Sequence, residues 1–294
     1  MKSGFVSIIG RPNAGKSTLL NALNGEKLAV VSDKPQTTRN TITGILTDKN
    51  KQIVFLDTPG IHTPKTKLGE FMVKEAKEAI SAVDMVLFVI EPGHDYDNEN
   101  IIATLKDSEV PVLLIINKID MYEKENLLEI IAKYSGLMQF DEIIPISAKK
   151  GDGVKLVMEA IEKRLEEGPM YFPDDMITDQ PEKQIAAEII REKALWCLDK
   201  EVPHGIAVEI SSFKENKKGI LEIGATIYCE KSSHKGIIIG KGGAMLKKIG
   251  SLARGDMERF FGTKVFLELW VKVKEGWRDS DFLLRNFGYD KSDN

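Results

Sequence analysis

The chain contains 294 residues with a formal net charge of −4, and 42% of its residues are hydrophobic and 29% are charged. This composition excludes collagen-like, mucin-like and wholly disordered proteins, and the length suffices for two domains of about 100–200 residues each. The two cysteines, Cys197 and Cys229, have neither metal-ligand spacing nor a disulfide-framework pattern, so we expect reduced thiols in a cytosolic chain. The longest apolar runs, such as 110–116, are far shorter than the roughly 18 residues of a membrane span, and we expect neither insertion nor export.

Charge is distributed unevenly along the chain. Residues 182–294 contain 20 lysines and arginines and 17 acidic residues, a net charge of +3, whereas residues 1–181 have a net charge of −7. Within 231–264, eight basic residues accompany two acidic ones, which gives a local net charge of +6. A positive segment of this kind indicates contact with a polyanion.

Short apolar runs alternate with helical stretches in the first part of the chain. We expect strands at 5–9, 53–56, 85–90, 112–116 and 143–146. We expect helices at 17–23, 67–80, 98–107, 125–134 and 154–165. This alternation predicts an α/β domain with a mostly parallel sheet and helices on both faces. Residues 41–46 suit an added antiparallel edge strand, because they closely precede the strand at 53–56.

A stretch rich in proline then breaks the pattern. Residues 168–181 contain three prolines and several acidic residues, which is typical of a linker. We therefore expect a first domain at 1–170, a linker at 171–181 and a second domain at 182–294.

The second part of the chain predicts a smaller α+β domain. It begins with an expected helix at 182–198, followed by strands at 205–213 and 219–229. Helices at 244–250 and 254–261 come next, and residues 265–273 alternate apolar and polar side chains as a half-buried strand does. The order of these elements is α-β-β-α-α-β.

The strand at 5–9 leads into a glycine-rich segment and then into a helix. This segment matches the pattern G-x-x-x-x-G-K-S/T with Gly10, Arg11, Pro12, Asn13, Ala14, Gly15, Lys16 and Ser17. A strand before and a helix after are the context in which such a loop binds phosphate. Gly10 and Gly15 permit the tight turn, Lys16 can reach the β and γ phosphates, and the Ser17 hydroxyl can ligate Mg²⁺. Together with Thr18 these are the expected phosphate-site residues, and a glycine-rich turn that binds nothing is the alternative.

Three further motifs each follow an expected strand. They consist of Asp57, Thr58, Pro59 and Gly60, of Asn117, Lys118, Ile119 and Asp120, and of Ser147, Ala148 and Lys149. Each motif alone is weak, because its Asp or Asn can instead cap a helix or a turn. In this order, and at the carboxyl ends of strands where ligands of such sheets bind, a chance match is disfavoured.

The same motifs predict which nucleotide binds. Asp57 can hold Mg²⁺ through water, and the Gly60 N–H can sense the γ-phosphate. The Asp120 carboxylate can accept hydrogen bonds from the ring N–H and the exocyclic amine of guanine, while the Ala148 N–H can meet the guanine carbonyl. Adenine offers no such pair of donors, which disfavours an ATPase. We therefore expect GTP and GDP as ligands.

These motifs closely resemble those of the translation-factor-like GTPases, and in particular those of the Era family. The resemblance covers essentially the whole chain and includes residues 34–39, 203–208 and 267–274. It implies a P-loop GTPase domain that hydrolyses GTP, with Lys16, Thr38 and Gly60 as the catalytic set. It also implies that Thr38 completes the Mg²⁺ shell with Ser17 and Asp57, whereas the sequence alone leaves Thr37 and Thr38 open.

The position after the Gly60 motif is unusual for a GTPase. Ile61 stands where a glutamine commonly orients the attacking water. The resemblance implies that water is positioned by other means, and that an asparagine at the position of Asn13 binds K⁺ in place of an arginine finger. We therefore expect K⁺ at Asn13 and slow intrinsic turnover, the alternative being that Asn13 only stabilises the loop. Arg39 is a candidate finger in cis, but an exposed arginine there is more often simply solvated.

A second glycine motif lies in the positive segment of the second domain. Its context resembles the type II KH domain, in which a G-x-x-G loop lets a nucleic-acid backbone approach closely and a residue such as Lys241 meets phosphate. We interpret 236–239 as a flanking apolar strand. The expected RNA-binding residues are Gly236, Ile239, Gly240, Lys241, Gly242, Gly243, Lys247 and Lys248. A solvated helix face and plain core packing are the alternatives for these lysines and isoleucines.

The resemblance to the Era family also implies the biological partner. It points to the 3′-terminal region of 16S rRNA, to assembly of the small (30S) ribosomal subunit, and to a cytoplasmic monomer that does not use DNA. A rival hypothesis is a membrane-associated signalling switch without an essential RNA. The basic residues of the helix at 182–198 are offset by acidic ones, which disfavours lipid as the main partner, and peripheral contact with the inner face of the membrane stays open.

Overall fold

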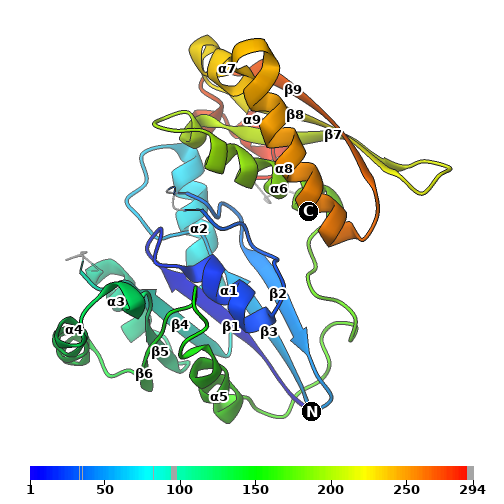
Figure 1. Ribbon diagram of the computed structural model, residues 1–294. Coiled ribbons are helices and arrows are strands. Elements are labelled where there is room, and N and C mark those ends of the chain that lie inside the picture. Colours follow the sequence, from blue (N-terminus) through cyan, green and yellow to red (C-terminus); the bar gives the residue numbers. More distant parts are fainter. Residues whose placement is uncertain (33, 35, 82, 94–97, 290–294) are drawn as a thin grey trace. The chain divides into compact units, whose positions relative to one another are not determined.

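The computed structural model describes residues 1–32, 34, 36–81, 83–93 and 98–289 (Figure 1). Pro35, a member of the segment 34–39, lies outside these residues. The chain divides into two compact units. The first comprises Met1–Val31, Thr38–Thr63 and Met72–Asp179, and the second comprises Ser32–Thr37, Pro64–Phe71 and Gln180–Asn294.

The first unit is built on a six-stranded sheet of order β2-β3-β1-β4-β5-β6. Its strands are β1 Lys2–Gly10, β2 Ile42–Thr47, β3 Lys51–Asp57, β4 Met85–Ile90, β5 Val112–Ile116 and β6 Glu142–Pro145. All neighbouring strands are parallel except β2 and β3, which are antiparallel. The predicted parallel sheet with one antiparallel edge strand is therefore confirmed.

Helices cover both faces of this sheet (Figure 1). They are α1 Lys16–Asn24, α2 Lys67–Ser81, α3 Glu99–Lys106, α4 Lys124–Leu137 and α5 Val154–Arg164. Leucines of α1 and Ile161 of α5 pack in one hydrophobic cluster with β1 and β4 residues. Ile101 of α3 and Tyr134 of α4 pack in a second cluster on the opposite face. Strands buried on both faces explain why their sequences are continuously apolar.

Residues 171–179 of the expected linker belong to the first unit. The buried side chain of Gln52 accepts hydrogen bonds from the backbone N–H groups of Tyr171 and Phe172 at 2.7 and 3.0 Å. It also donates one to the Phe172 carbonyl at 2.8 Å. The Ile45 N–H donates to the Ile177 carbonyl at 2.9 Å. These bonds fasten the stretch along the edge of the sheet.

The second unit has a three-stranded sheet of order β7-β8-β9. Its strands are β7 Ala207–Glu215, β8 Leu221–Cys229 and β9 Val265–Val273. Its helices are α6 Glu182–Cys197, α7 Ser232–Ile239, α8 Ala244–Phe261 and α9 Asp281–Asn286. Strand β8 pairs antiparallel with β7 and parallel with β9. One hydrophobic core joins the sheet to α6, α7 and α8.

Two expectations for this unit are wrong. Residues 236–239 form the end of helix α7 rather than a strand, because three successive isoleucines carry no periodicity that separates the two. The helix break expected between 250 and 254 is absent, and α8 runs unbroken from Ala244 to Phe261. Gly250 does not end the helix. A Cβ there would be 3.2 Å from Leu269 Cδ1 on β9, so the glycine lets α8 pack closely against that strand. The order α-β-β-α-α-β therefore holds, with α7 as its second helix.

Two of the three basic residues of α6 are buried, contrary to a lipid-facing role, and Lys183 is exposed. Arg191 and Lys193 are 0% and 1% exposed. Arg191 pairs with Glu188 and donates to the carbonyl of Thr37. Lys193 lies within 2.5 Å of an Asp256 carboxylate oxygen on α8. In the part of the chain that the structure describes, no helix combines the length and hydrophobicity of a membrane span.

Candidate functional site

The glycine-rich segment between β1 and α1 forms a tight loop. Gly10 has φ of 150° and Gly15 has φ of 93°. A Cβ on Gly10 would lie 2.2 Å from the Val89 carbonyl oxygen, and one on Gly15 would lie 2.1 Å from Asn117 Nδ2. Neither position accepts a side chain without displacing its neighbour. The loop conformation therefore requires both glycines.

Lys16 lies beneath this loop at the start of α1. Its Nζ donates hydrogen bonds to the carbonyls of Gly10 and Arg11 at 3.2 and 3.0 Å. Burial lowers the pKa of Lys16 to about 8, and the charge of Asp57 opposes this shift. The ammonium group is thus held where an anion on the loop would meet it.

Three side chains from separate elements meet beside Lys16. Ser17 Oγ donates to Asp57 Oδ2 at 2.6 Å and lies 2.9 Å from Thr38 Oγ1. Thr38 Oγ1 lies 3.4 Å from the same Asp57 oxygen. The neighbouring Thr37 hydroxyl instead donates to the Lys34 carbonyl at 2.6 Å. The structure therefore joins Thr38, and not Thr37, to Ser17 and Asp57.

This cluster fits a hard divalent cation. Asp57 is fully buried, and burial raises its pKa to about 6 although Lys16 opposes the shift. Its Oδ1 atom is buried and has no hydrogen-bond partner among the described residues. Buried carboxylate oxygens normally have a partner, and carboxylate and hydroxyl oxygens are the donors that Mg²⁺ accepts. Asp57, Ser17 and Thr38 would hold such an ion.

The turn after β3 packs directly on the phosphate loop. The Thr58 hydroxyl donates to the Ile8 carbonyl at 2.9 Å, and the Ile61 N–H donates to the Gly10 carbonyl at 3.1 Å. A Cβ on Gly60 would lie 2.5 Å from the nitrogen of Pro12, and Pro59 is buried. Contact this close brings the Gly60 backbone to the loop.

Asn117 connects the phosphate loop to the loop that follows β6. Its Nδ2 donates to the Ala14 carbonyl at 2.9 Å, and its Oδ1 accepts from the Ala148 N–H at 2.9 Å. The side chain is buried. The Ala148 N–H, expected at the guanine carbonyl, is thus engaged by Asn117 in this structure. No sequence signal separates these two partners, because both require the same motif.

Asp120 is kept ionised by its neighbours. The Ser147 hydroxyl donates to its Oδ1 at 2.7 Å, and Lys150 Nζ lies 3.5 Å from its Oδ2. The Ser147 hydrogen bond is the largest cause of the lowered pKa of Asp120. Lys118 pairs with Glu91 at 2.7 Å, while Lys149 is exposed. The carboxylate can accept hydrogen bonds from a ligand that offers donors.

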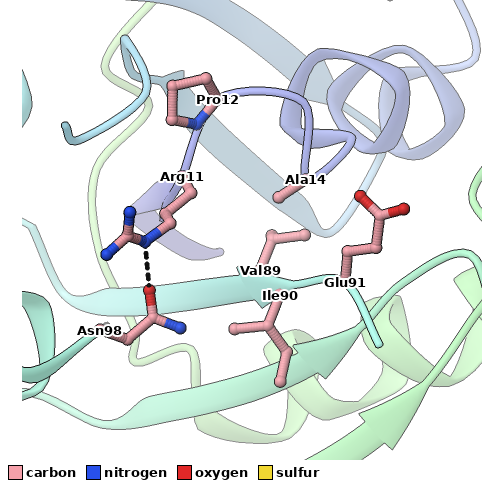
Figure 2. A pocket seen from close by; sticks show the side chains of 7 residues that line it. All are labelled: Arg11, Pro12, Ala14, Val89, Ile90, Glu91 and Asn98. Atoms are coloured by element: carbon pink, nitrogen blue, oxygen red, sulfur yellow. Dashed lines mark hydrogen bonds between the residues drawn. The ribbon is translucent and has the colours of Figure 1, made fainter. Parts of the chain in front are cut away.

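Other motif members lie around the phosphate loop in less direct roles. Arg11 Nε donates to Asn98 Oδ1 at 2.9 Å across a small cavity (Figure 2). The cavity is also lined by Pro12, Ala14, Val89, Ile90 and Glu91. Asn13 is exposed and has φ of 65°, and Thr18 is half-buried in the first turn of α1. Sequence reasoning missed Asn98, Glu91 and Lys150, since no motif marks them.

The expectation of a solvated Arg39 is wrong. Its side chain is 1% exposed and is among the largest fully buried side chains. Arg39 follows Thr38 directly in the chain, so its burial anchors the backbone beside Thr38. Sequence position could not reveal this burial, because a charged residue in a loop usually faces water.

The second unit presents its glycine loop between α7 and α8. Gly240, Gly242 and Gly243 have φ of 72°, 59° and 82°. A Cβ on Gly240 would lie 2.7 Å from Met245 Cβ, whereas one on Gly242 or Gly243 would meet nothing within 4 Å. Lys241 between them is exposed. The loop is therefore an open backbone surface with one free-standing lysine.

A groove of about 510 Å³ continues from this loop between α8 and β9. It is lined by Gly243, Leu246, Lys247, Gly250, Ser251, Arg254, Val265, Phe266, Leu267 and Leu269. Its walls are apolar, and two basic side chains lie along α8. Lys248 and Gly236 are exposed outside the lining, and Ile239 packs partly in the core. The lining residues of α8 recur every three or four positions, and this helical spacing is the sequence signal that could have predicted the α8 side of the groove.

Comparison with known proteins gives matches to both parts of the chain. A family profile described as 50S ribosome-binding GTPase matches residues 5–118, and a KH domain profile matches residues 201–278. The chain is 59% identical to the GTPase Era of Ruminiclostridium cellulolyticum over 297 residues, which covers 100% of this chain and 99% of that relative. It is 57% identical to the GTPase Era of Clostridium kluyveri, over 98% of this chain and 99% of that relative.

Two solved structures resemble the whole chain with a TM-score of 0.94, each covering 98% of this chain and 99% of the other. One is an Era variant from Aquifex aeolicus bound to GDP·AlF4⁻, at 42% identity. The other is Era in complex with MgGDPNP and nucleotides 1506–1542 of 16S ribosomal RNA, at 43% identity. From the phosphate loop, the guanine motifs, the KH unit and these full-length matches, it follows that the chain belongs to the Era family of GTPases.

Proposed function

We propose that this chain is a GTP-hydrolysing switch that binds the 3′-terminal region of 16S rRNA through its KH groove and assists assembly of the small (30S) ribosomal subunit. The observation that carries the proposal is the combination, in one chain, of a guanine-type phosphate loop and an open G-x-x-G loop with a basic, apolar-walled groove. A family member of the same overall structure has been solved with MgGDPNP and nucleotides 1506–1542 of 16S rRNA.

In the nucleotide site, Lys16 and the backbone of the phosphate loop bind the phosphates. Asp57, Ser17 and Thr38 are the proposed Mg²⁺ ligands, supported by the unpartnered Asp57 Oδ1 and the two adjacent hydroxyls. When bound, Mg²⁺ neutralises negative charge on the β and γ phosphates. Asp120 selects guanine because its carboxylate accepts hydrogen bonds from the ring N–H and the exocyclic amine of that base.

The remaining loops orient these groups. Asn117 fixes the Ala14 carbonyl and the Ala148 N–H, so the phosphate loop and the base loop keep one relative position. The γ-phosphate orders residues 34–39 and 57–66, and hydrolysis reverses this order, which gates RNA binding.

Asn13 is the proposed K⁺ ligand. It is exposed on the phosphate loop, and Ile61 cannot orient a water molecule. GTP turnover in K⁺ buffer is expected to exceed turnover in Na⁺ buffer, and the Asn13→Ala variant is expected to lose the difference. Equal rates in both buffers for the native chain would show that Asn13 only shapes the loop.

The RNA contact is proposed to be electrostatic at the backbone and apolar at the bases. Lys241, Lys247 and Arg254 meet phosphates, so the affinity should fall as the salt concentration rises. Gly240, Gly242 and Gly243 allow the RNA backbone to approach closely. We place the protein in the cytoplasm, where its proposed ribosomal partner is found. The buried Arg191 and Lys193 disfavour the rival membrane-bound switch.

One experiment tests the combined proposal. A fluorescent single-stranded RNA with the small-subunit 3′-end sequence is titrated with the protein in GDP and in a non-hydrolysable GTP analogue. Tighter binding is expected with the analogue, and Gly242→Asp is expected to abolish it.

Gly262→Asp is the matched control for that variant. Gly262 ends the same helix α8, has φ of 66° and also has nothing within 4 Å of its Cβ position. Both substitutions thus add one negative charge at an equally strained, open position. Absence of RNA binding by the native chain in either nucleotide would reject the proposal and favour a membrane or protein partner.

A further inference from the structure

Strand β9 carries two exposed aromatic side chains, of which Phe266 lines the groove and Trp270 lies outside its lining. Phe266 is 54% exposed and Trp270 is 47% exposed. The alternate residues Val265, Leu267 and Val271 pack in the core between the sheet and the helices. Because successive side chains of a strand point to opposite faces, Phe266 and Trp270 share the face that the three core helices leave open.

Trp270 is accommodated by a glycine on the neighbouring strand. A Cβ on Gly224 of β8 would lie 3.3 Å from Trp270 Cζ3, so the missing side chain leaves room for the indole. Trp270 makes no hydrogen bond or ring contact with any residue that the structure describes. A large aromatic side chain that is half exposed and has no partner marks an interaction surface.

Glu268 lies between the two aromatic residues on the same face. It is exposed and is in register with Gly224 of β8. Within the described residues it forms no hydrogen bond or ion pair. Phe266 is in register with Glu222, whose carboxylate accepts from Asn216 Nδ2 at 2.8 Å. Lys272 of β9 and Lys214 of β7, which pairs with Glu222, are also exposed on this face, so it carries acidic and basic side chains beside the two aromatic rings.

The adjoining groove adds further basic side chains. Lys247 and Arg254 line it from α8, and Phe266 lines it from β9. Phe266 thus belongs both to the groove and to the exposed face of the sheet. A single-stranded RNA presents phosphates and aromatic bases together, so it matches a surface on which basic side chains lie close to exposed aromatic rings.

We propose that Phe266, Glu268 and Trp270 form a base-reading stripe that contacts the same RNA as the groove. This inference rests on the proposed function and adds to it the residues that select bases. Bases stack on the rings of Phe266 and Trp270, while the phosphates remain on the basic side. The Glu268 carboxylate accepts hydrogen bonds from a base that presents donors, and guanine presents the best pair, its ring N–H and its exocyclic amine.

The distance between Phe266 and Trp270 determines which bases of the RNA they can contact. Four residues along a strand span about 13 Å, so Phe266 and Trp270 contact bases that are not adjacent in the RNA. Glu268 lies midway between them and meets a base held between the two rings. The stripe therefore requires single-stranded RNA that extends beyond the groove.

The test uses the full chain with the GTP analogue and the fluorescent 3′-end RNA. Phe266→Ala and Trp270→Ala are each expected to weaken binding at least about fivefold, because stacking on an aromatic side chain is lost. Trp196→Ala is the matched control, since Trp196 on α6 is 50% exposed but lies outside the stripe. Trp196→Ala is expected to bind as the native chain does. In this variant the RNA should quench the fluorescence of Trp270, which is then the remaining exposed tryptophan.

Glu268 is tested by pairing a protein variant with an RNA variant. Each guanine of the RNA is replaced in turn by inosine, which lacks the exocyclic amine. One replacement is expected to weaken binding by the native chain and to cause no further loss in Glu268→Ala. Additive losses at every guanine would exclude a direct contact between Glu268 and guanine.

The outcomes separate this inference from the proposed function. If Gly242→Asp loses RNA while Trp270→Ala binds normally and RNA does not quench the fluorescence of Trp196→Ala, the stripe is not an RNA surface and the groove stands. That result would assign the stripe to a protein partner. If the native chain does not bind the RNA, both the stripe and the proposed function fail. Circular dichroism melting checks that each variant is folded.

Discussion

The Ser17 hydroxyl donates a 2.6 Å hydrogen bond to Oδ2 of Asp57, although the two residues are 40 positions apart in the chain. Ser17 lies in the first turn of α1 and Asp57 ends β3, so the bond exists only because β1 and β3 are parallel neighbours. It leaves the other oxygen of Asp57 buried and without a partner among the residues described. This pair therefore defines where a divalent cation would bind.

Removal of the Ser17 hydroxyl should separate metal-dependent from metal-independent nucleotide binding. Ser17→Ala is expected to weaken GDP binding in Mg²⁺ at least about tenfold, because one proposed ligand is lost. Binding in EDTA should change little, since Lys16 and the loop backbone remain. Titration of a fluorescent GDP derivative with and without Mg²⁺ measures both. Equal losses in the two conditions would mean that Ser17 only shapes the loop.

Thr38 and Thr37 form a matched pair for testing the first switch. Thr38→Ala is expected to lower kcat for GTP at least about tenfold, since its hydroxyl lies beside Ser17 and Asp57. Thr37→Ala is expected to retain near-native kcat, because the Thr37 hydroxyl is bonded to the Lys34 carbonyl. Single-turnover GTP hydrolysis compares the two. A larger loss in Thr37→Ala would transfer the metal role to Thr37.

Asp120 should determine which purine binds. Asp120→Asn replaces one carboxylate acceptor by an N–H donor, which opposes the donors of guanine. The variant is expected to bind GDP at least about a hundredfold more weakly and to prefer XDP, whose base has a carbonyl at that position. Competition between GDP and XDP measures the change. A simple loss of both nucleotides would instead indicate a folding defect around Ser147.

Nucleotide binding should take up protons near pH 8. The pKa of Lys16 is about 8 because its ammonium is desolvated. Phosphates favour the charged form and raise this pKa, so about half a proton is taken up at pH 8 when GDP binds. Asp57, with a pKa of about 6, is already ionised there and contributes nothing.

Calorimetry in two buffers of different ionisation enthalpy measures this uptake. The binding enthalpy at pH 8 should depend on the buffer, and the proton uptake by Lys16 should fall as the pH is lowered, because Lys16 is then already charged before GDP binds. Near pH 6, Mg²⁺ binding should instead release protons from Asp57, because a cation favours the carboxylate. A binding enthalpy independent of the buffer at pH 8 would show that Lys16 is fully protonated before GDP binds.

Asn117 should matter for stability as well as for nucleotide binding. Asn117→Ala leaves the Ala14 carbonyl and the Ala148 N–H buried without partners. The free energy of unfolding of the first unit is expected to fall by about 2–4 kcal/mol. Urea unfolding without nucleotide measures this loss. An unchanged unfolding midpoint would show that water replaces both hydrogen bonds.

Local sequence pattern was enough to predict the sheet, the phosphate loop and the family. Continuous apolar strands alternating with helices specify a covered parallel sheet, and the motif of Gly10 to Ser17 requires a strand before it and a helix after it. These are local properties, so neighbouring residues in the chain suffice to predict them. The alternation along Val265–Val273 likewise predicted a half-buried strand, which is what β9 is.

Only the tertiary structure decided which side chains meet. The choice between Thr37 and Thr38, the burial of Arg39 and the commitment of the Ala148 N–H to Asn117 depend on segments far apart in the chain. The same holds for residues 236–239, where three isoleucines suit a helix and a strand equally until packing selects one face. Local pattern predicts most elements, whereas burial and hydrogen-bond partners are set by what the rest of the fold places beside them.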